Sequence, residues 1–481
     1  MIVRLLQASR HGSQKQSDPM RLLEILFIAA DLLLLSASLA GRAAWTVWMR
    51  VLAIAALVLA IAQVCIEGAR WQMYPAYFVA AALATFVIAN WNHSKGLASL
   101  FSSGGIAALL SAVALGTVLP IFSLPSPDGP FAIGTVTHIW FRPVPSRDIA
   151  PDWAPSRKII VQLWYPAASR QKGLIAPYRD SDSGWFLTHY LALVRTHTQI
   201  GVPVSPAQST YPVLLFSPAW DAGRTDYTTF YETLASHGFV VAAMEHMKDL
   251  DGPFLGMDLE QYREAGALVR RRAEDAIYVL DQLTKRNESD PDKLLTGRLD
   301  LSRVGILGHS FGGAAAAETC WLDRRFKAGI DVDGDLYGEV ADAGTSQPFF
   351  FILSDSRPPT EADLHAADPR VRFTNEMDDL NWKRQESWLA HRGGYELMIR
   401  KSSHVNYSDR PLFSPVKRLT GAGEINPRRA LQIADAYILA FFDRALNQQP
   451  GNLLDDPTER FPEAIFKAYP ASQHIPASNS K

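Results

Sequence analysis

Two hydrophobic patterns divide the chain. From residue 22 to 122, four long apolar runs follow one another with only short polar joints, at about residues 22–40, 49–66, 74–90 and 104–122. Each run approaches the ~20 residues that an α-helix needs to cross a hydrocarbon core of about 30 Å. Because the runs repeat and do not end in a single small-residue cleavage site, they predict four retained transmembrane helices and not a signal peptide.

Beyond residue 156 the pattern changes to short β-branched and aromatic runs that alternate with helix-length segments. The runs predicted as strands are 159–165, 212–217, 239–245, 304–307, 328–332, 348–353 and 396–400. The segments predicted as covering helices, from apolar residues at three-to-four spacing, are 227–236, 258–285 and 427–446. This alternation predicts an α/β fold with a mainly parallel sheet flanked by helices.

The two patterns predict the domain organisation. Residues 124–156 are rich in proline and polar groups, which breaks helical periodicity and indicates a linker that runs into the first strand region. We therefore expect a basic N-terminal tail, a transmembrane anchor of four helices, this linker, a catalytic domain and a C-terminal tail, at residues 1–21, 22–123, 124–156, 157–449 and 450–481.

Charge and cysteine content exclude several classes of protein. Lys plus Arg (47) and Asp plus Glu (49) leave a net charge of −2, so no global field favours nucleic acid. Only Cys65 and Cys320 occur, which supports neither a disulfide framework nor a cysteine metal site. The sequence has no metal-ligand cluster, Walker loop or dinucleotide fingerprint. We expect no metal and no cofactor, and the sequence leaves the oligomeric state open.

Basic residues beside the apolar runs indicate on which side of the membrane the ends of the predicted helices lie. Four of them precede the first run, at positions 4, 10, 15 and 21, and favour a cytoplasmic N-terminus. The connecting loops carry the opposite bias, with Arg42 and Arg50 in the first and Arg70 in the second. Because four spans return the chain to its starting side, we expect a multi-pass protein of a bacterial inner membrane, with the cytoplasmic side favoured for the catalytic domain.

Asp31 lies near the middle of the first apolar run. A carboxylate at that depth is costly, and by default it indicates an intramembrane function. However, no second acid, no base and no Pro/Gly-broken helix builds an ion path around it. An anchor is therefore the preferred interpretation over a transporter.

The strongest chemical motif is Gly308-His309-Ser310-Phe311-Gly312. It follows an apolar strand and precedes Gly313 and four alanines, which is a strong helix start. In a nucleophile elbow the glycines permit a strained strand-to-helix turn that exposes the serine hydroxyl above the sheet. Ser310 is therefore the predicted nucleophile of a serine hydrolase.

A serine needs a base that removes its proton and a carboxylate that orients the base. The downstream histidines are at positions 365, 391, 404 and 474, and His404 is favoured because it follows a strand, where active sites of open α/β sheets gather. His246 ends an earlier strand and is a candidate pocket residue. Asp333 and Asp355 both close strands after the elbow, and the residues alone do not separate them as the acid.

The developing oxyanion needs N–H donors, conventionally from the residue after the nucleophile and from a loop after an earlier strand. These are Phe311 and the loop 217–221. Pro218 has no N–H, which leaves Ala219 or Trp220 as the second donor. The neighbouring Asp221 is expected to point outward or to bind Arg224.

A run of three arginines, Arg270-Arg271-Arg272, lies on the long predicted helix. Such a run could attract lipid headgroups. We prefer to interpret it as a solvated helix face, balanced by Glu264, Glu274 and Asp275.

Several further motifs occur together in one hydrolase family. They are Gly129-Pro130-Phe131 with Gly134, Trp164-Tyr165-Pro166, Leu234 to Phe239 before Glu245-His246, Arg325-Phe326 with Gly329-Ile330, and Ser403 to Tyr407. With the elbow they cover most of residues 129–409, and the set resembles the plasma-type (isoform II) platelet-activating factor acetylhydrolases among the dienelactone-hydrolase-like α/β-hydrolases. The resemblance departs at Pro218, Ala219 and Asp221, where the family typically has a histidine and small residues.

The resemblance implies Ser310 as nucleophile, Asp333 as acid and His404 as base, with the backbone N–H groups of Trp220 and Phe311 as oxyanion donors. It also implies short-acyl, phospholipid-like esters as substrates, cleaved through an acyl-enzyme without a cofactor. The partners expected are therefore such a small molecule and the lipid bilayer. A general esterase or thioesterase is the enzymatic alternative, and a non-catalytic membrane scaffold with a hydrolase fold is the alternative from another class.

Overall fold

The computed structural model describes residues 20–40, 47–89, 95–143, 156–168, 173–180, 186–246, 259–450, 452–455 and 460–471. The chain divides into two compact units. The first comprises residues 1–124 with 177–196 and 412–416, and the second comprises 125–176, 197–411 and 417–481. His474, Arg42, the basic positions 4, 10 and 15, and most of the two expected tails lie outside the described residues.

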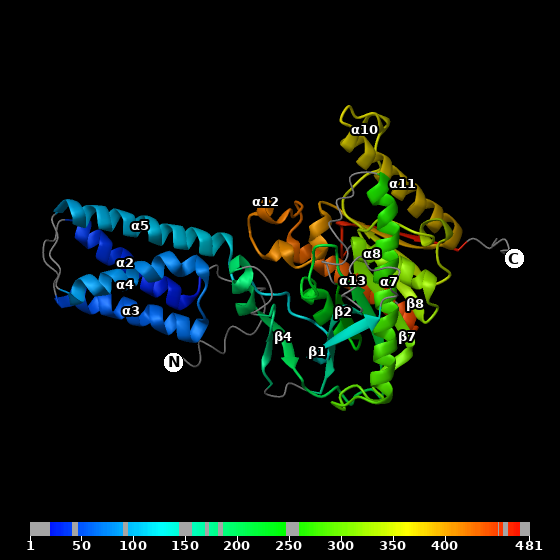
Figure 1. The fold of residues 1–481 in the computed structure, drawn as a ribbon, viewed down its shortest axis with the longest axis horizontal. Helices are drawn as coiled ribbons and strands as arrows, with labels where there is room; N and C mark the ends of the chain where they lie inside the picture. Colours follow the sequence, from blue (N-terminus) through cyan, green and yellow to red (C-terminus); the bar gives the residue numbers. More distant parts are fainter. Residues whose placement is uncertain are drawn as a thin grey trace. The chain divides into compact units, whose positions relative to one another are not determined.

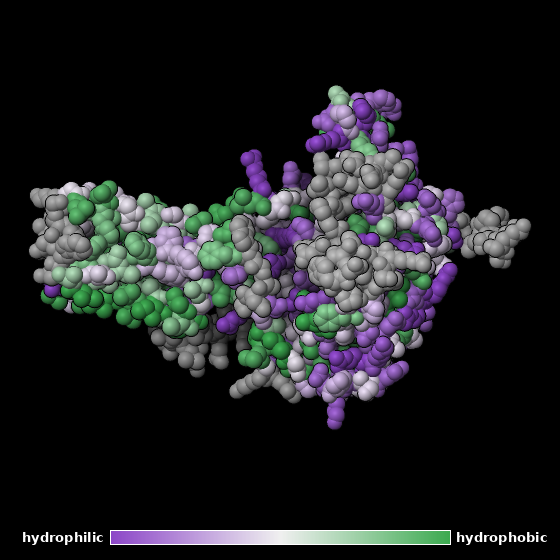
Figure 2. Space-filling model, in the orientation of Figure 1, coloured by the Kyte–Doolittle hydropathy of each residue, from purple (hydrophilic) through white to green (hydrophobic). Residues whose placement is uncertain are grey.

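The first unit is built on four apolar helices (Figure 1, blue and cyan). They are α2 (Leu22–Leu39), α3 (Val47–Glu67), α4 (Tyr74–Ile88), which follows the short η1 (Trp71–Met73), and α5 (Lys95–Val118). By length and composition all four could cross a membrane. Apolar side chains cover their outer surface, as the green area of Figure 2 shows, with Val58, Phe78 and Leu110 more than half exposed.

Helix α5 begins nine residues before the apolar run from which it was predicted. The helix continues through Gly104 and Gly105, and Gly105 lies against Leu35 of α2. A Cβ at this position would come within 2.9 Å of the leucine side chain, so the glycine permits close helix packing. The boundary was predicted too late because residues 95–103 contain a lysine, a glycine and three serines, which lower the hydropathy of the first turns of the helix.

Polar groups are buried inside the four-helix bundle. Arg70 and Glu24 form a fully buried ion pair at 2.7 Å, and Arg21 binds the same carboxylate at 2.7 Å. Arg70, the basic residue of the second connecting loop, is thus paired inside the first unit. Asp31 is fully buried, and neither of its carboxylate oxygens has a hydrogen-bond partner among the described residues.

Two segments from later in the sequence belong to this first unit. The helix η3 (Phe186–Leu193) accepts a 3.0 Å hydrogen bond at the Leu187 carbonyl from the Trp71 indole. Phe122 stacks on Phe413, with the ring centroids 5.3 Å apart. These segments therefore form a small hydrophobic cluster of the first unit, outside the four-helix bundle, with Trp71 and the residues that follow α5.

The second unit contains an eleven-stranded sheet among the described residues, in the order β11-β10-β9-β8-β7-β5-β6-β2-β1-β4-β3. The strands are β1 (Ala132–Pro143), β2 (Ser156–Ala167), β3 (Ile175–Pro177), β4 (Arg195–Ile200), β5 (Tyr211–Ser217), β6 (Val240–Glu245), β7 (Leu299–His309), β8 (Phe326–Val332), β9 (Phe349–Leu353), β10 (Gly394–Ile399) and β11 (Ala464–Tyr469). From β6 through β10 the neighbours are parallel, whereas β2 and β11 pair antiparallel. The predicted mainly parallel sheet is confirmed.

Helices cover both faces of this sheet. They are α6 (Thr228–Ser236), α7 (Leu259–Glu288), α8 (Phe311–Leu322), α11 (Pro369–Arg392) and α13 (Pro427–Asn447), with shorter turns α9 (Val340–Ala343), α10 (Glu361–Leu364), α12 (Lys417–Thr420), α14 (Asn452–Asp455), η5 (His404–Tyr407) and η6 (Arg410–Leu412). Ala276 of α7, Ala316 of α8 and Trp388 of α11 share one core cluster with strand residues such as Val213. Helices α6 and α13 pack together and do not contribute to that cluster. Strand side chains alternate between the two layers.

The structure differs from the sequence expectations at the edges of the sheet. Residues 464–469, expected within a C-terminal tail, form β11 and pair with β10. Helix α11 was not predicted because only three of its side chains are buried, so its apolar periodicity is weak. Strand β1 lies within residues 124–156, where a linker and the first strand region were expected.

Candidate active site

Ser310 lies on the turn between β7 and α8. Its backbone has φ 57° and ψ −126°, a strained conformation for a residue with a side chain. Glycines make the turn possible: a Cβ at Gly308 would lie 2.0 Å from the carbonyl oxygen of Gly312, and a Cβ at Gly312 would lie 2.0 Å from that of Ser217. The local sequence therefore places the serine hydroxyl at the carboxyl edge of the sheet, beside the N-terminus of α8.

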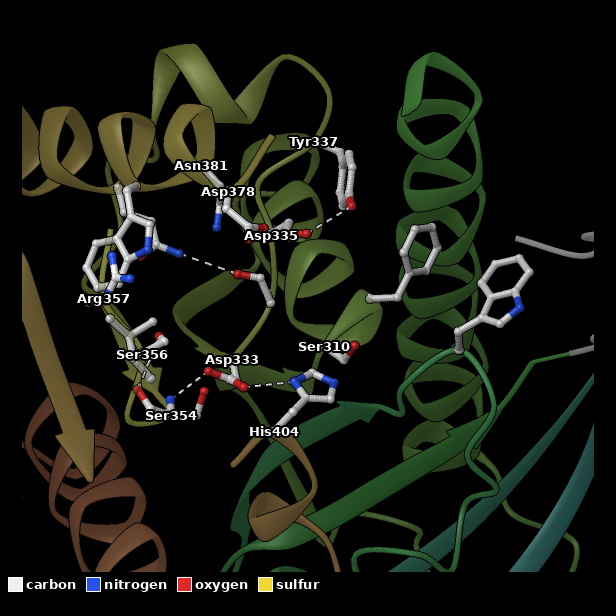
Figure 3. Close-up of a pocket in the computed structure, with 16 residues that line it drawn as sticks. Ser310, Asp333, Asp335, Tyr337, Ser354, Ser356, Arg357, Asp378, Asn381 and His404 are labelled. Atoms are coloured by element: carbon white, nitrogen blue, oxygen red, sulfur yellow. Dashed lines mark hydrogen bonds and ion pairs between the residues drawn. The ribbon is translucent and has the colours of Figure 1, made fainter. Parts of the chain in front are cut away.

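His404 and Asp333 meet beside this serine (Figure 3). The His404 Nδ1 lies 2.8 Å from Asp333 Oδ2, and the second oxygen of Asp333 accepts a 2.6 Å hydrogen bond from the Ser354 N–H. Asp355 lies elsewhere, since its carboxylate accepts from the backbone N–H of Lys401 at 2.6 Å. Of the two candidate acids, the structure brings Asp333 and not Asp355 to the histidine.

The Asp333 carboxylate also sets the electrostatics of His404. Burial disfavours the imidazolium and on its own would lower the pKa of His404. The hydrogen bond and the charge of Asp333 outweigh burial, so the pKa of His404 lies above its usual value. An imidazole in this state is suited to accept a proton from a hydroxyl and to hold it.

A cavity of about 400 Å³ opens over these residues in the second unit. Its lining includes Ser310, Asp333 and His404 with the aromatic side chains of Trp220, Phe311, Tyr337 and Trp382. Asp335 and Asp378 add acidic groups, and burial, followed by the charge of Asp378, raises the pKa of Asp335 to about 6. The cavity is within the size range of small-molecule sites.

Both segments expected to supply oxyanion donors reach this cavity. The Ala219 N–H donates to the Tyr227 hydroxyl at 3.1 Å, which leaves Trp220 as the candidate donor of the β5–α6 loop. The rings of Trp220 and Phe311 meet edge to face, with centroids 5.0 Å apart. The Asp221 side chain is 71% exposed and lies 2.9 Å from Arg410, so it points outward, which was one of the two expected arrangements. Arg224 binds Gln162 and Glu245.

His309, the variable residue of the elbow, connects Tyr227 to the loop that carries His404 through hydrogen bonds. Its Nε2–H donates to the backbone carbonyl of His404 at 2.9 Å, which leaves Nδ1 to accept from the Tyr227 hydroxyl at 2.9 Å. Burial, followed by the charge of His404, holds the pKa of His309 well below its usual value, so the ring stays neutral. Sequence reasoning missed this chain of hydrogen bonds, although His309 lies inside the motif itself.

Tyr227→Phe is expected to lower the thermal midpoint of the detergent-solubilised protein. The change leaves the buried His309 Nδ1 and Ala219 N–H without a partner, which costs about 1–3 kcal/mol of stability. Tyr231→Phe in α6, the helix that follows Tyr227, is the matched control, because the Tyr231 hydroxyl is buried without a hydrogen-bond partner among the described residues. Equal midpoints for the two variants in a melting experiment would contradict a structural role for the Tyr227 hydroxyl.

His246 was a candidate pocket residue, and the structure places it elsewhere. Its Nε2 lies 3.1 Å from Ser217 Oγ and its Nδ1 lies 2.9 Å from Asp275, which also binds Arg157 at 2.7 Å. All four side chains are buried, and none of them lines the cavity. This second Ser-His-Asp arrangement therefore fixes the end of β5 and does not form a second reactive site.

No group of three or more His, Cys, Asp or Glu side chains in the described part of the chain could hold a metal ion.

A mainly parallel sheet with a serine on such a turn, and a histidine on the loop after a later strand, is the arrangement of the α/β-hydrolases. The family model of platelet-activating factor acetylhydrolase, isoform II, matches residues 152–251 and 280–458, which together are more than half of the chain. The chain belongs to this family, as the resemblance of its motifs predicted, and it is a carboxylic ester hydrolase.

Curated relatives and a solved structure agree with this assignment. A probable 1-alkyl-2-acetylglycerophosphocholine esterase of Arthroderma benhamiae is 26% identical over 403 residues, which cover 76% of this chain and 98% of the relative. The platelet-activating factor acetylhydrolase of Cavia porcellus is 32% identical over 228 residues, or 40% of this chain and 51% of the relative. The ferulic acid esterase from Streptomyces cinnamoneus aligns with a TM-score of 0.54 and 29% identity, covering 72% of this chain and 98% of that one.

Proposed function

We propose that this protein is a membrane-anchored serine esterase that hydrolyses short-acyl, phospholipid-like esters through an acyl-enzyme on Ser310. The observation that carries the proposal is the hydrogen bond between His404 and Asp333 beside the strained Ser310 turn. Those three side chains occur together in one cavity, in a family whose curated relatives are named for this chemistry.

The geometry supports a two-step reaction. His404 accepts the Ser310 hydroxyl proton as the oxygen attacks the ester carbonyl, and the negative charge on the carbonyl oxygen is held by the N–H groups of Trp220 and Phe311. Collapse of this intermediate breaks the ester bond, and the leaving alcohol takes the proton from His404. A water molecule then gives a proton to His404 and attacks the acyl carbon. The bond between this carbon and the Ser310 oxygen breaks, the acid leaves, and the proton returns from His404 to the Ser310 oxygen.

The four apolar helices support the second part of the proposal, attachment to a bilayer. Their lengths and exposed apolar surfaces match a membrane interior better than water. An enzyme that is already anchored at a membrane needs no separate surface for binding lipid, so amphipathic esters become suitable substrates. We propose that the protein lies in an inner membrane and that its catalytic domain is on the cytoplasmic side.

The substrate class is tested by an activity screen on the detergent-solubilised full chain. We expect kcat/KM for nitrophenyl acetate to be at least about tenfold higher than for nitrophenyl esters whose acyl chain has eight or more carbons. A tenfold difference corresponds to ~1.4 kcal/mol of transition-state free energy. A 1-alkyl-2-acetyl phospholipid should be deacetylated as well. Higher efficiency on long acyl chains or thioesters would favour the general esterase.

A second candidate function comes from the solved ferulic acid esterase. The cavity has four aromatic side chains, which could also bind an aromatic acyl group. A feruloyl ester therefore belongs in the same screen, and faster cleavage of this ester than of nitrophenyl acetate would replace the short-acyl proposal.

A further inference from the structure

Arg272 differs from its two neighbours in the arginine run of α7. Its side chain is only 2% exposed, whereas that of Arg270 is 49% exposed beside Glu274. The interpretation of the whole run as a solvated face is therefore wrong at Arg272. A buried guanidinium is costly unless it is paired or hydrogen-bonded, so the contacts of Arg272 need an explanation.

Those contacts converge on the two segments that carry the proposed oxyanion donors. The guanidinium carbon lies 4.9 Å from the centre of the Trp220 ring and 5.0 Å from the centre of the Phe311 ring. A guanidinium N–H donates to the Pro218 carbonyl at 2.9 Å. One planar cation thus contacts the β5–α6 loop and the first residue of α8 together.

We propose that Arg272 is a positioning residue that holds the backbone N–H groups of Trp220 and Phe311 toward one point in the cavity. This inference rests on the proposed role of those two N–H groups. The two segments are 91 positions apart in the sequence and have no backbone continuity. Arg272 supplies a common support, since its guanidinium lies beside both rings and its N–H donates to the loop carbonyl.

Arginine suits this task better than other side chains. Its guanidinium is planar, stays charged and presents several N–H donors, so it can contact aromatic rings and donate to a carbonyl at once. A lysine keeps the positive charge but has no planar group that could lie beside an aromatic ring. The Ser217–His246–Asp275 network beneath the loop fixes the end of β5, and Arg272 fixes the residues that follow it.

The expected consequence is a defect in the chemical step. The oxyanion exists only after attack, so misaligned donors lower kcat and leave substrate binding nearly unchanged. Loss of one donor costs about 10²- to 10³-fold in kcat, and a misplaced donor should cost less. We expect a fall of roughly 10- to 100-fold.

The experiment compares Arg272→Met and Arg272→Lys with Arg270→Met, a control on the exposed side of the same helix. For each full-length protein in detergent, kcat and KM are measured on nitrophenyl acetate, and the rate of covalent labelling of Ser310 by a fluorophosphonate is followed. Kinetic values are referred to the fraction of labelled sites, which corrects for unfolded protein. Arg272→Met should lower kcat and the labelling rate together, with KM within about twofold, while Arg270→Met behaves as the parent.

The conservative variant separates positioning from charge. Arg272→Lys should recover only a small part of kcat, and full recovery would overturn the proposal in favour of a simple charge effect. An unchanged kcat in Arg272→Met, or a raised KM alone, would also overturn it. Absence of labelling in the parent protein would instead defeat the proposed function, so the two failures are distinguishable.

A second variant covers the case in which Arg272→Met does not fold. Phe311→Leu keeps the backbone N–H and removes one of the two rings that the guanidinium contacts. It should lower kcat with little change in KM. Where both variants fold, their effects should be less than additive in the double variant, because both break the same contact. Additive effects would show that the residues act separately.

Discussion

Ser310→Ala is expected to abolish ester hydrolysis and covalent labelling by an organophosphonate, while the protein remains folded. Removing the nucleophile of a serine hydrolase lowers kcat by about 10⁶-fold, because binding and oxyanion contacts alone give little turnover. Alanine has to adopt the same backbone angles as Ser310, φ 57° and ψ −126°, and it has a Cβ as serine does. We therefore expect little change in the thermal midpoint of the detergent-solubilised variant.

Ser356→Ala is the matched control for this experiment. Ser356 lies at the cavity, and the one hydrogen bond that its hydroxyl makes within the described part of the chain is donated to the Ser354 carbonyl at 3.4 Å. Its replacement should leave both labelling and turnover close to those of the parent protein. Labelling that persists in Ser310→Ala would place the nucleophile on another side chain, whereas complete absence of labelling in the parent would favour a non-catalytic scaffold.

The core of the fold could be predicted from the sequence because its strands are buried on both faces. Strand β9 and β5 up to its last residue, Ser217, consist of continuous apolar residues, both strands are buried throughout, and their predicted positions differ from the structure by one residue. The edge strand β11 has no fully buried residue, so its sequence resembles a surface segment. Its existence depends on pairing with β10, a tertiary contact that local patterns do not record.

In the candidate site too, some residues are predictable from local sequence, whereas others depend on tertiary contacts. Ser310 is recognisable because the glycines and flanking elements that its turn needs are adjacent in the sequence. The choice between Asp333 and Asp355 depends on how the loop after β10 directs His404, which the residues alone left open. Arg272, Tyr227 and His309 could not be found in advance, since each acts through a contact with a distant segment.

Asp333→Asn is expected to lower kcat by about 10³- to 10⁴-fold. An amide can no longer stabilise the imidazolium or select the correct tautomer of His404. The backbone should tolerate the change, because Asp333 has φ 55° and asparagine adopts such angles more readily than most residues. Asp355→Asn should alter kcat less than about threefold, since its carboxylate binds the Lys401 backbone N–H and makes no contact with His404.

The pH dependence of kcat/KM gives this comparison a second readout. His404 has to be neutral to accept a proton, so activity rises with pH through its pKa, which Asp333 holds above the usual value despite burial. In Asp333→Asn the two largest raising contributions, the hydrogen bond and the charge of Asp333, disappear while burial remains, so the midpoint of the rise should move to lower pH. In Asp355→Asn it should stay where it is. A larger loss of kcat in Asp355→Asn, or a midpoint that moves only there, would transfer the role of the acid to Asp355.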